Sequence, residues 1–427
     1  MSGGSGERIL VRAGKDPLTP LSAARSLSVR HDGVFGSNAG NMLFYTAAWR
    51  TLLADGVELV ADGYSSERDA ADRVVSRIDA ECDRFVIPLA NAFRTSFVPQ
   101  LERLTEVIRR VDVPVTVLGV GAQLPLGATV DAAPEGLRET VRSFVAAVLD
   151  RSPSIGVRGG FTRDFLASLG FGDDVIDVIG CPSLYGYGSD GRVRETTSLT
   201  PSSRLAVTYS PYLRHAGPFV REVTSRFADS YVVPQTVEAL ALMLWGEPTR
   251  YARKADLPET PDHALYRSDR MRFFVDATTW IDTLRERDLV VGTRIHGTIA
   301  GLLAGTPSIL IAHDSRTREL AEFHRIPYRR KGAMRKVDVE RWYDEADFDG
   351  FRTAHPQNLE TFRRFIERHG LAHTLGEPRP RFDRALEDVA FAPPVRTPHG
   401  PRAREARPLG ERWRRRAVRV ARRASKS

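Results

Sequence analysis

Short apolar runs alternate with longer helical stretches along most of the chain. In the first half, the helical stretch 41–56 precedes apolar runs within residues 84–91, 113–123, 154–170 and 175–186. Each run leads into a polar or glycine-containing loop, and a helical pattern commonly follows it. Alternation of this kind predicts a parallel sheet covered by helices on both faces.

A second series of the same type follows a polar, turn-rich stretch at residues 187–203. Its helices include residues 277–288, and its apolar runs are residues 204–210, 230–235, 271–276, 288–293 and 307–314. We therefore predict an α/β fold in which two Rossmann-like domains with parallel sheets face one another across a cleft. Ligands should bind at the carboxyl ends of the strands.

The same pattern divides the chain into four parts. Residues 1–24 are rich in Gly, Ser and Pro and predict a flexible leader. Residues 25–195 then form the N-terminal domain, and residues 200–375 form the C-terminal domain with its trailing helices. Residues 376–427 are a Pro-rich and basic tail.

The net charge of +8 is distributed unevenly along the chain. Residues 396–427 carry twelve Lys or Arg and two Glu, a charge of +10, so residues 1–395 carry −2. The basic character therefore belongs to the tail, and the globular part gives no signal for specific nucleic-acid binding.

In the tail, Trp413, Val420 and several alanines lie at near-helical spacing among the arginines. This spacing suggests a basic amphipathic helix on an anionic membrane surface, and a solubilising tail explains it equally well.

Cysteine content and hydropathy bear on the compartment. Cys82 and Cys181 are the two cysteines, and neither belongs to a CxxC or other metal-ligand cluster. No apolar run reaches about 18 residues, and the first residues lack the apolar core of a secretory signal. We expect a cytoplasmic protein, peripheral at the inner face of the membrane if the tail binds there, with no bound metal.

The stretch "VVGTRIHGTIAGLLAG" carries the clearest candidate chemistry. A buried strand ends at Gly292, and a helix of small residues begins near Arg294 and His296. A helix N-terminus attracts anions, so Gly297 and Thr298 are candidate ligands for a phosphate or a carboxylate. An arginine adds a fork of donors for either anion, and a histidine exchanges protons near neutral pH. Taken alone, an R-x-H sequence is more typical of a salt-bridged arginine and a hydrogen-bonded histidine at a helix start than of a binding site.

Four further motifs occur with this stretch, and together the five resemble the polysaccharide pyruvyl transferases. The R-I-H tripeptide and the "GTPSILIA" that follows resemble the family's C-terminal signature. "FGSNAGNMLF" resembles its Asn-x-Gly-Asp loop and first helix, and "GVGAQ", "IGVRGG" and "VIGCPSLY" follow in the family's order. The resemblance runs from about residue 30 to about residue 330.

The resemblance implies the two-Rossmann-domain arrangement of GT-B glycosyltransferases and an activity. The family transfers pyruvate from phosphoenolpyruvate to a sugar of a cell-surface glycan, usually as a cyclic ketal, and the donor is a substrate, so no cofactor is expected. Arg294 and His296 then serve donor binding and proton transfer, with Arg158 as a second donor-binding arginine. The acceptor is a polysaccharide or its lipid-linked precursor.

One position departs from the family pattern. The chain has Asn38-Ala39-Gly40-Asn41 where the family often has Asn-x-Gly-Asp. A lost carboxylate would alter acceptor binding or proton transfer, whereas a helix cap would be served nearly as well by Asn, and we favour the cap. Asn38, Gly40 and Asn41 are expected on the acceptor side of the cleft, together with Gln123 and Asp314; for Asp314 a solvated strand-end position is an equal alternative.

Two other functions remain open at this point. A GT-B glycosyltransferase that uses a nucleotide sugar would share the fold and the basic pair, although no base- or ribose-binding signature is evident. A non-catalytic glycan-binding protein of the same fold is the second alternative, which the exchange at Asn41 favours and the presence of both Arg294 and His296 opposes.

Overall fold

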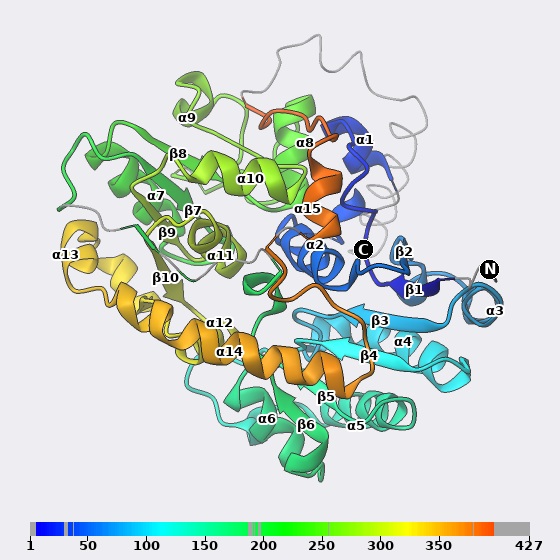
Figure 1. Ribbon diagram of the computed structural model, residues 1–427. Helices are drawn as coiled ribbons and strands as arrows, with labels where there is room; N and C mark the ends of the chain where they lie inside the picture. Colours follow the sequence, from blue (N-terminus) through cyan, green and yellow to red (C-terminus); the bar gives the residue numbers. More distant parts are fainter. Residues whose placement is uncertain are drawn as a thin grey trace, which may run out of the picture.

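The computed structural model describes residues 6–29, 33–36, 38–186, 191, 193–194, 198–254, 256–378 and 380–396. The chain forms two halves, each built on a parallel sheet with helices on its faces (Figure 1). This confirms the predicted α/β fold with two Rossmann-like domains. The amphipathic tail segment lies outside the described residues, and no helix among the described residues is long and apolar enough to cross a membrane.

The first sheet has the strand order β2-β1-β3-β4, with every pair parallel. A parallel β5–β6 pair continues it beside β4, where Val120 pairs with Val157. The strands are β1 (Glu7–Val11), β2 (Val57–Ala61), β3 (Arg84–Pro88), β4 (Val115–Leu118), β5 (Ile155–Val157) and β6 (Ile176–Val178). All residues of β4 are buried, as expected for a strand covered on both faces.

Helices of the first half bury an apolar stripe against this sheet. In α4 (Val98–Arg110), Leu101, Leu104 and Ile108 recur at helical spacing and are fully buried. The other helices are α2 (Gly40–Leu52), α3 (Ala71–Glu81), α5 (Glu135–Leu149) and α6 (Gly160–Ala167).

The prediction of a flexible leader over residues 1–24 is wrong for its described part. Residues 7–11 form β1, which lies between β2 and β3, and Ile9, Leu10 and Val11 are almost completely buried. The apolar run "ILV" is short and surrounded by Gly, Ser and Pro, so local composition concealed a central strand. The short helix α1 (Ala23–Ser28) then packs against α8 (Val237–Trp245) of the second half.

The second sheet has the order β11-β10-β9-β7-β8 and is also parallel. Its strands are β7 (Leu205–Thr208), β8 (Ser230–Val233), β9 (Leu289–Gly292), β10 (Ser308–Ala312) and β11 (Tyr328–Arg330). Its helices are α7 (Ala216–Arg226), α8 (Val237–Trp245), α9 (Ala264–Arg267), α10 (Ala277–Leu284), α11 (Ile295–Leu303), α12 (Ser315–His324) and α13 (Val339–Asp344).

The predicted strand at residues 271–276 does not form. Met271 makes a single bridge to Val232 of β8, and Phe273 pairs instead with Val395. Asp276 then caps α10 by accepting a hydrogen bond from the backbone of Thr279 at 2.6 Å. The apolar residues of this segment are buried by packing without a ladder of hydrogen bonds, a difference that apolar content alone does not reveal.

Two C-terminal helices fasten the second half to the first. The long helix α14 (Phe348–Arg368) runs across both halves in Figure 1, and Arg368 at its end pairs with Asp177. The helix α15 (Arg381–Leu386) lies on α2, where Asp383 pairs with Arg50 and Phe382 is fully buried. The predicted tail over residues 376–427 is therefore wrong at its beginning, since α15 is part of the packed structure.

Candidate functional site

The corner between β9 and α11 places the two predicted residues. Gly292 has a φ of 154°, and a β-carbon there would overlap the carbonyl oxygen of Thr208, so only glycine fits between β9 and β7. Thr293 bonds Ser210 through the two hydroxyls at 3.0 Å. Arg294 is the N-cap residue of α11 with an extended backbone, which directs its side chain away from the helix.

Arg294 is anchored at one point and carries its charge into a pocket between the halves. Its Nε donates to the carbonyl oxygen of Tyr209 at 3.1 Å. Among the described residues no carboxylate lies within ion-pair distance of its guanidinium, so the salt bridge considered from the sequence is absent there. Burial lowers the pKa of Arg294, with the neighbouring Arg316 acting in the same direction. An anion that entered the pocket would relieve both effects.

His296 is the second residue of α11 and is buried against α2 of the other half. A β-carbon at Gly40 would come within 2.7 Å of the Cβ of His296, and the ring of Phe44 is 6.5 Å away. Burial lowers the pKa of His296 well below its usual value, and Arg158, Arg316 and Arg294 lower it further. The imidazole is therefore neutral at pH 7, and its Nε2 has no hydrogen-bond partner among the described residues.

Arg158 lies behind this histidine and does not line the pocket. It is completely buried, and its Nε donates to the carbonyl oxygen of Gly119 at 2.6 Å. Its guanidinium lies 5.1 Å from the ring centroid of Phe44, and both terminal nitrogens lack a hydrogen-bond partner among the described residues. Burial lowers the pKa of Arg158 to about 10. A buried cation whose two terminal NH2 groups lack partners is costly to stability, and an anion bound beside His296 would reduce that cost.

The Asn-Ala-Gly-Asn loop has a different structure from the expected cap. Asn38 caps locally, because its Oδ1 accepts from the backbone N–H of Gly40 at 2.8 Å. Asn41 makes no cap to α2; its amide donates to the carbonyl oxygens of Phe35 at 2.8 Å and Gly36 at 3.3 Å. A carboxylate cannot donate these bonds, so the favoured cap interpretation is wrong and Asn is specifically suited to this loop. Both asparagines line the pocket.

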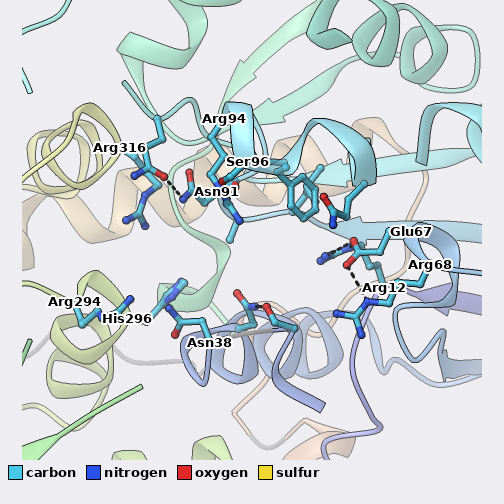
Figure 2. Close-up of a pocket in the computed structure, with 18 of the residues that line it drawn as sticks. Arg12, Asn38, Glu67, Arg68, Asn91, Arg94, Ser96, Arg294, His296 and Arg316 are labelled. Atoms are coloured by element: carbon cyan, nitrogen blue, oxygen red, sulfur yellow. Dashed lines mark hydrogen bonds and ion pairs between the residues drawn. The ribbon is translucent and has the colours of Figure 1, made fainter. Parts of the chain in front are cut away.

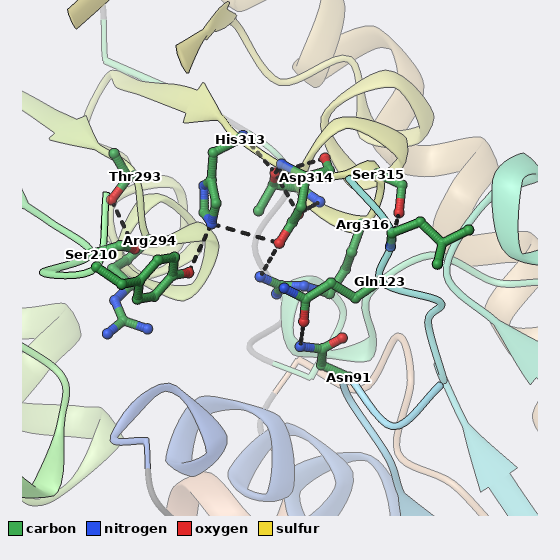
Figure 3. A network of polar contacts seen from close by, with 12 residues as sticks. Asn91, Gln123, Ser210, Thr293, Arg294, His313, Asp314, Ser315 and Arg316 are labelled. Carbon is green, nitrogen blue, oxygen red and sulfur yellow. Dashed lines mark hydrogen bonds and ion pairs between the residues drawn. The ribbon is translucent and has the colours of Figure 1, made fainter. Parts of the chain in front are cut away.

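The opposite wall is formed by the loop after β3 and the start of α12 (Figures 2 and 3). Asn91 donates from its amide to Gln123 at 2.6 Å. Arg94 donates to Ser96 at 3.0 Å and to the carbonyl oxygen of Asn91. Arg316 lies 3.5 Å from Asp314, and its Nε has no hydrogen-bond partner among the described residues. These side chains place polar donors and two further cations across from Arg294.

The far end of the pocket contains one carboxylate between two arginines. Glu67 pairs with Arg12 at 2.6 Å, and Arg68 lies 3.9 Å from its other oxygen. Figure 2 shows this group at a distance from Arg294 and His296. Over the described residues, the lining holds five arginines and a single carboxylate, in a cavity of about 380 Å³. Such a pocket suits a substrate with several negative charges.

Five predicted site residues lie outside this lining: Arg158 and Gly40, already described, and Gly297, Thr298 and Asp314. Gly297 packs against Thr208 and Gln235, where a β-carbon would clash, and Thr298 is fully buried. Asp314 caps α12 by accepting from the backbone N–H of Thr317 at 2.8 Å, so it is not the solvated strand-end residue considered as the alternative. The structure thus brings together Arg294, His296, Asn38, Asn41 and Gln123, with Gly40 and Arg158 in contact with His296 or its surroundings.

The sequence did not single out several lining residues. Arg12 belonged to the supposed leader, and Glu67 and Arg68 lie in a stretch without an evident motif. Arg94 and Arg316 each follow a strand of a parallel sheet, at the edge where ligands bind, and this was the available signal. No group of three or more potential metal ligands occurs among the described residues.

The fold and the pocket define a class: a two-domain α/β protein of the GT-B type, with a cationic site between its Rossmann-like halves. Residues 38–315, more than half of the chain, match the family model described as polysaccharide pyruvyl transferase. The chain belongs to the polysaccharide pyruvyl transferase family, and the predicted membership is confirmed.

The solved structures with similar chain traces include several UDP-N-acetylglucosamine 2-epimerases, all at low identity. A UDP-N-acetylglucosamine 2-epimerase from Rickettsia bellii has 10% identity and a TM-score of 0.46, with 85% of this chain and 96% of that chain covered. A putative enzyme of the same name from Listeria monocytogenes has 11% identity and a TM-score of 0.40, covering 90% and 94%. At these values the matches do not indicate what this chain binds. No curated protein matches the sequence.

Proposed function

We propose that the protein transfers the pyruvyl group of phosphoenolpyruvate to two hydroxyls of a glycan sugar and forms a cyclic ketal. The observation that carries this proposal is the group at one end of the pocket, where a neutral, buried His296 lies beside two arginines. Arg294 has no carboxylate within ion-pair distance among the described residues, and Arg316 shares Asp314 at 3.5 Å and keeps an Nε without a partner there. Family membership supports the reaction class.

Donor binding follows from the charges. Phosphoenolpyruvate carries a phosphate and a carboxylate, and Arg294 and Arg316 can each pair with one of them by charge-assisted hydrogen bonds. Arg158, which lies next to His296, contributes through its charge or through its two terminal NH2 groups, which have no partners among the described residues. Bound anion raises the pKa of His296, because it offsets the three arginines that lower it.

Proton transfer is then assigned to His296. The first sugar oxygen bonds to C2 of the enol, and its proton passes through the imidazole to the methylene carbon, which becomes a methyl group. The second sugar oxygen bonds to the same C2 while the bond from C2 to the phosphate oxygen breaks. Inorganic phosphate leaves, and the second hydroxyl proton goes to it or to solvent. Asn38, Asn91 and Gln123 offer hydrogen-bonding groups for the sugar hydroxyls.

A thermal-shift comparison tests the donor. Phosphoenolpyruvate and a panel of nucleotide sugars are added to the wild type, to Arg294→Ala and to Arg226→Ala, a control arginine exposed on α7 and paired with Glu340. We expect stabilisation by phosphoenolpyruvate in the wild type and the control, and none in Arg294→Ala. Stabilisation by a nucleotide sugar alone would replace the proposal with a glycosyltransferase.

A second experiment separates binding from chemistry. His296→Asn should keep much of the phosphoenolpyruvate-induced shift and lose phosphate release in the presence of a glycan acceptor, because the imidazole carries the proton and the arginines carry the affinity. Phosphate release at the wild-type rate would remove His296 from the mechanism.

We also propose that the acceptor is presented at an anionic membrane surface, to which the basic segment 400–427 binds. Flotation of the full chain with liposomes containing phosphatidylglycerol should fall when residues 400–427 are deleted and should persist with a deletion of residues 1–5. Equal flotation with and without the basic segment would refute this attachment.

A further inference from the structure

Tyr212 differs from the other aromatic residues by its exposure. Its side chain is 47% exposed, and no other large hydrophobic side chain among the described residues is comparably exposed. It lines the pocket from the loop after β7, on the C-terminal half. An exposed ring at the edge of a polar pocket offers a flat apolar surface next to hydrogen-bonding groups.

The loop holds this ring in place from two sides. The hydroxyl of Tyr212 and Nε2 of His313 lie 2.9 Å apart and share a hydrogen bond. Lys254 donates to the carbonyl oxygens of Pro211 at 2.5 Å and Leu213 at 3.4 Å, on either side of Tyr212. A fixed ring loses little conformational entropy when a ligand packs on it, so this exposure is compatible with a binding surface.

Arg94 lies on the other half and keeps an uncompensated charge. Its donors reach Ser96 and the backbone of Asn91, and no carboxylate among the described residues is within ion-pair distance. Burial lowers the pKa of Arg94 to about 10, and Arg316 and Arg12 lower it too, whereas Glu67 and Tyr212 act in the opposite direction. Arg94 is therefore near Tyr212, and it gains from an added anion.

The donor does not account for this cation. Figure 2 shows Arg94 and Arg294 on separate walls of the pocket, with His296 next to Arg294. The carboxylate of Glu67, at the far end of the pocket, is already shared by Arg12 and Arg68. With phosphoenolpyruvate between Arg294 and Arg316, the remaining lining would still carry a positive excess that a neutral sugar leaves unmatched.

We propose that the acceptor is an anionic pyranoside whose ring packs on Tyr212 and whose carboxylate or phosphate pairs with Arg94. This rests on the proposed function, because it names the acceptor class of the same pocket. The apolar C–H face of a pyranose suits the face of a tyrosine, while its hydroxyls face the polar groups of the opposite wall. The anion fixes which edge of the sugar is directed toward the donor.

The test measures dissociation constants of three glycosides by NMR titration of the full chain. The probes are methyl glucuronide, glucose 1-phosphate and the neutral methyl glucoside. We expect at least one charged probe to bind about tenfold more tightly than the neutral one, and a preference between the two charged probes identifies carboxylate or phosphate as the source. Equal binding of all three overturns the proposal.

Variants assign the contacts. Arg94→Gln should abolish the preference for the charged probe, whereas Arg103→Gln, an exposed arginine on α4 paired with Glu106, should keep it. Tyr212→Ala should weaken all three probes, and Tyr212→Phe, which retains the ring, should weaken them less. A charge preference that survives Arg94→Gln, or unchanged binding in Tyr212→Ala, overturns the assignment.

Competition separates this proposal from the donor proposal. The charged glycoside should remain bound when phosphoenolpyruvate saturates the protein; its displacement would mean that it occupies the donor position and would overturn a separate subsite. If phosphoenolpyruvate itself fails to bind, the proposed function fails, and the Arg94-dependent preference is still measured independently.

Discussion

At the scale of single residues, the pocket combines a neutral histidine with cations that keep it neutral. His296 is buried between Gly40 and Phe44, and Arg158, Arg316 and Arg294 all oppose its protonation. A ligand that neutralises those arginines changes the proton affinity of the imidazole without touching it. We therefore expect the binding of an anion beside these arginines to be coupled to proton uptake by His296.

This coupling is measurable by calorimetry. The folded protein holds the pKa of His296 well below its usual value, so the ring is neutral at pH 6.5 in the absence of ligand. Phosphoenolpyruvate should raise that pKa and cause proton uptake, seen as a binding enthalpy that differs between phosphate-free buffers of unequal ionisation enthalpy. In His296→Asn the buffer dependence should become smaller. Equal uptake in both proteins would assign the proton to another group.

Asn41 provides a second residue-scale prediction. Its amide donates to the carbonyl oxygens of Phe35 and Gly36, so Asn41→Asp would direct a carboxylate at two acceptors. We expect a loss of about 1–3 kcal/mol in the free energy of unfolding at pH 7, measured with urea. The loss should shrink below about pH 4, where a protonated carboxyl donates again. Wild-type stability at pH 7 would contradict the structural role of the amide.

At the scale of elements, α2 and α11 meet so closely that one glycine decides the position of the histidine. Gly40 begins α2, and its missing side chain leaves the space that the ring of His296 occupies. Gly136 has a similar place at the beginning of α5, but nothing lies within 4 Å of where its β-carbon would be. The two glycines differ in their surroundings and share their helical context.

Gly40→Ala should therefore displace His296 and lower phosphate release, while Gly136→Ala should leave it unchanged. Because alanine favours helix by up to about 1 kcal/mol, Gly136→Ala should also be as stable as the wild type or slightly more stable. Thermal unfolding and a phosphate-release assay of both variants test this. Full activity in Gly40→Ala would show that the histidine tolerates movement and that the close contact is not required.

Local patterns in the sequence predict some of these elements and miss others. The β9–α11 corner was predictable because a continuous apolar strand, a glycine turn and a small-residue helix are consecutive in the chain. β1 was missed because three apolar residues in a Gly- and Pro-rich context become a strand only through β2 and β3 on either side. Arg12 was missed together with β1. Arg94 and Tyr212 line one pocket only because of how the two halves approach each other, which local sequence patterns do not contain.

At the scale of the whole molecule, the two halves are joined by a buried carboxyl. Glu319, on α12 of the second half, accepts hydrogen bonds from the backbone N–H of Thr162 at 2.9 Å and from its hydroxyl at 2.8 Å, at the beginning of α6 in the first half. Thr162 in turn accepts from the backbone of Ala122 at 2.9 Å, in the loop that also carries Gln123 to the pocket. The contact between the halves is thus continuous with the candidate site.

This carboxyl should make stability depend on pH in an identifiable window. Burial raises the pKa of Glu319 from 4.5 to about 7, despite the hydrogen bonds from Thr162. The folded protein therefore binds more protons than the unfolded chain between these two values, and this residue's contribution to the free energy of unfolding falls by up to about 3 kcal/mol as the pH rises from 4.5 to 7.

Glu319→Gln keeps an acceptor for Thr162 and removes the titration, so its stability should fall less over this range. Glu322→Gln removes an exposed carboxyl from the same helix and should retain the pH dependence of the wild type. Urea unfolding of the wild type and both variants between pH 5 and 8 tests whether a titrating group joins the halves. If the free energies of unfolding of the wild type and Glu319→Gln change in parallel with pH, Glu319 is not the origin of the dependence. A carboxyl whose pKa is the same in the folded and unfolded protein contributes no pH dependence to stability.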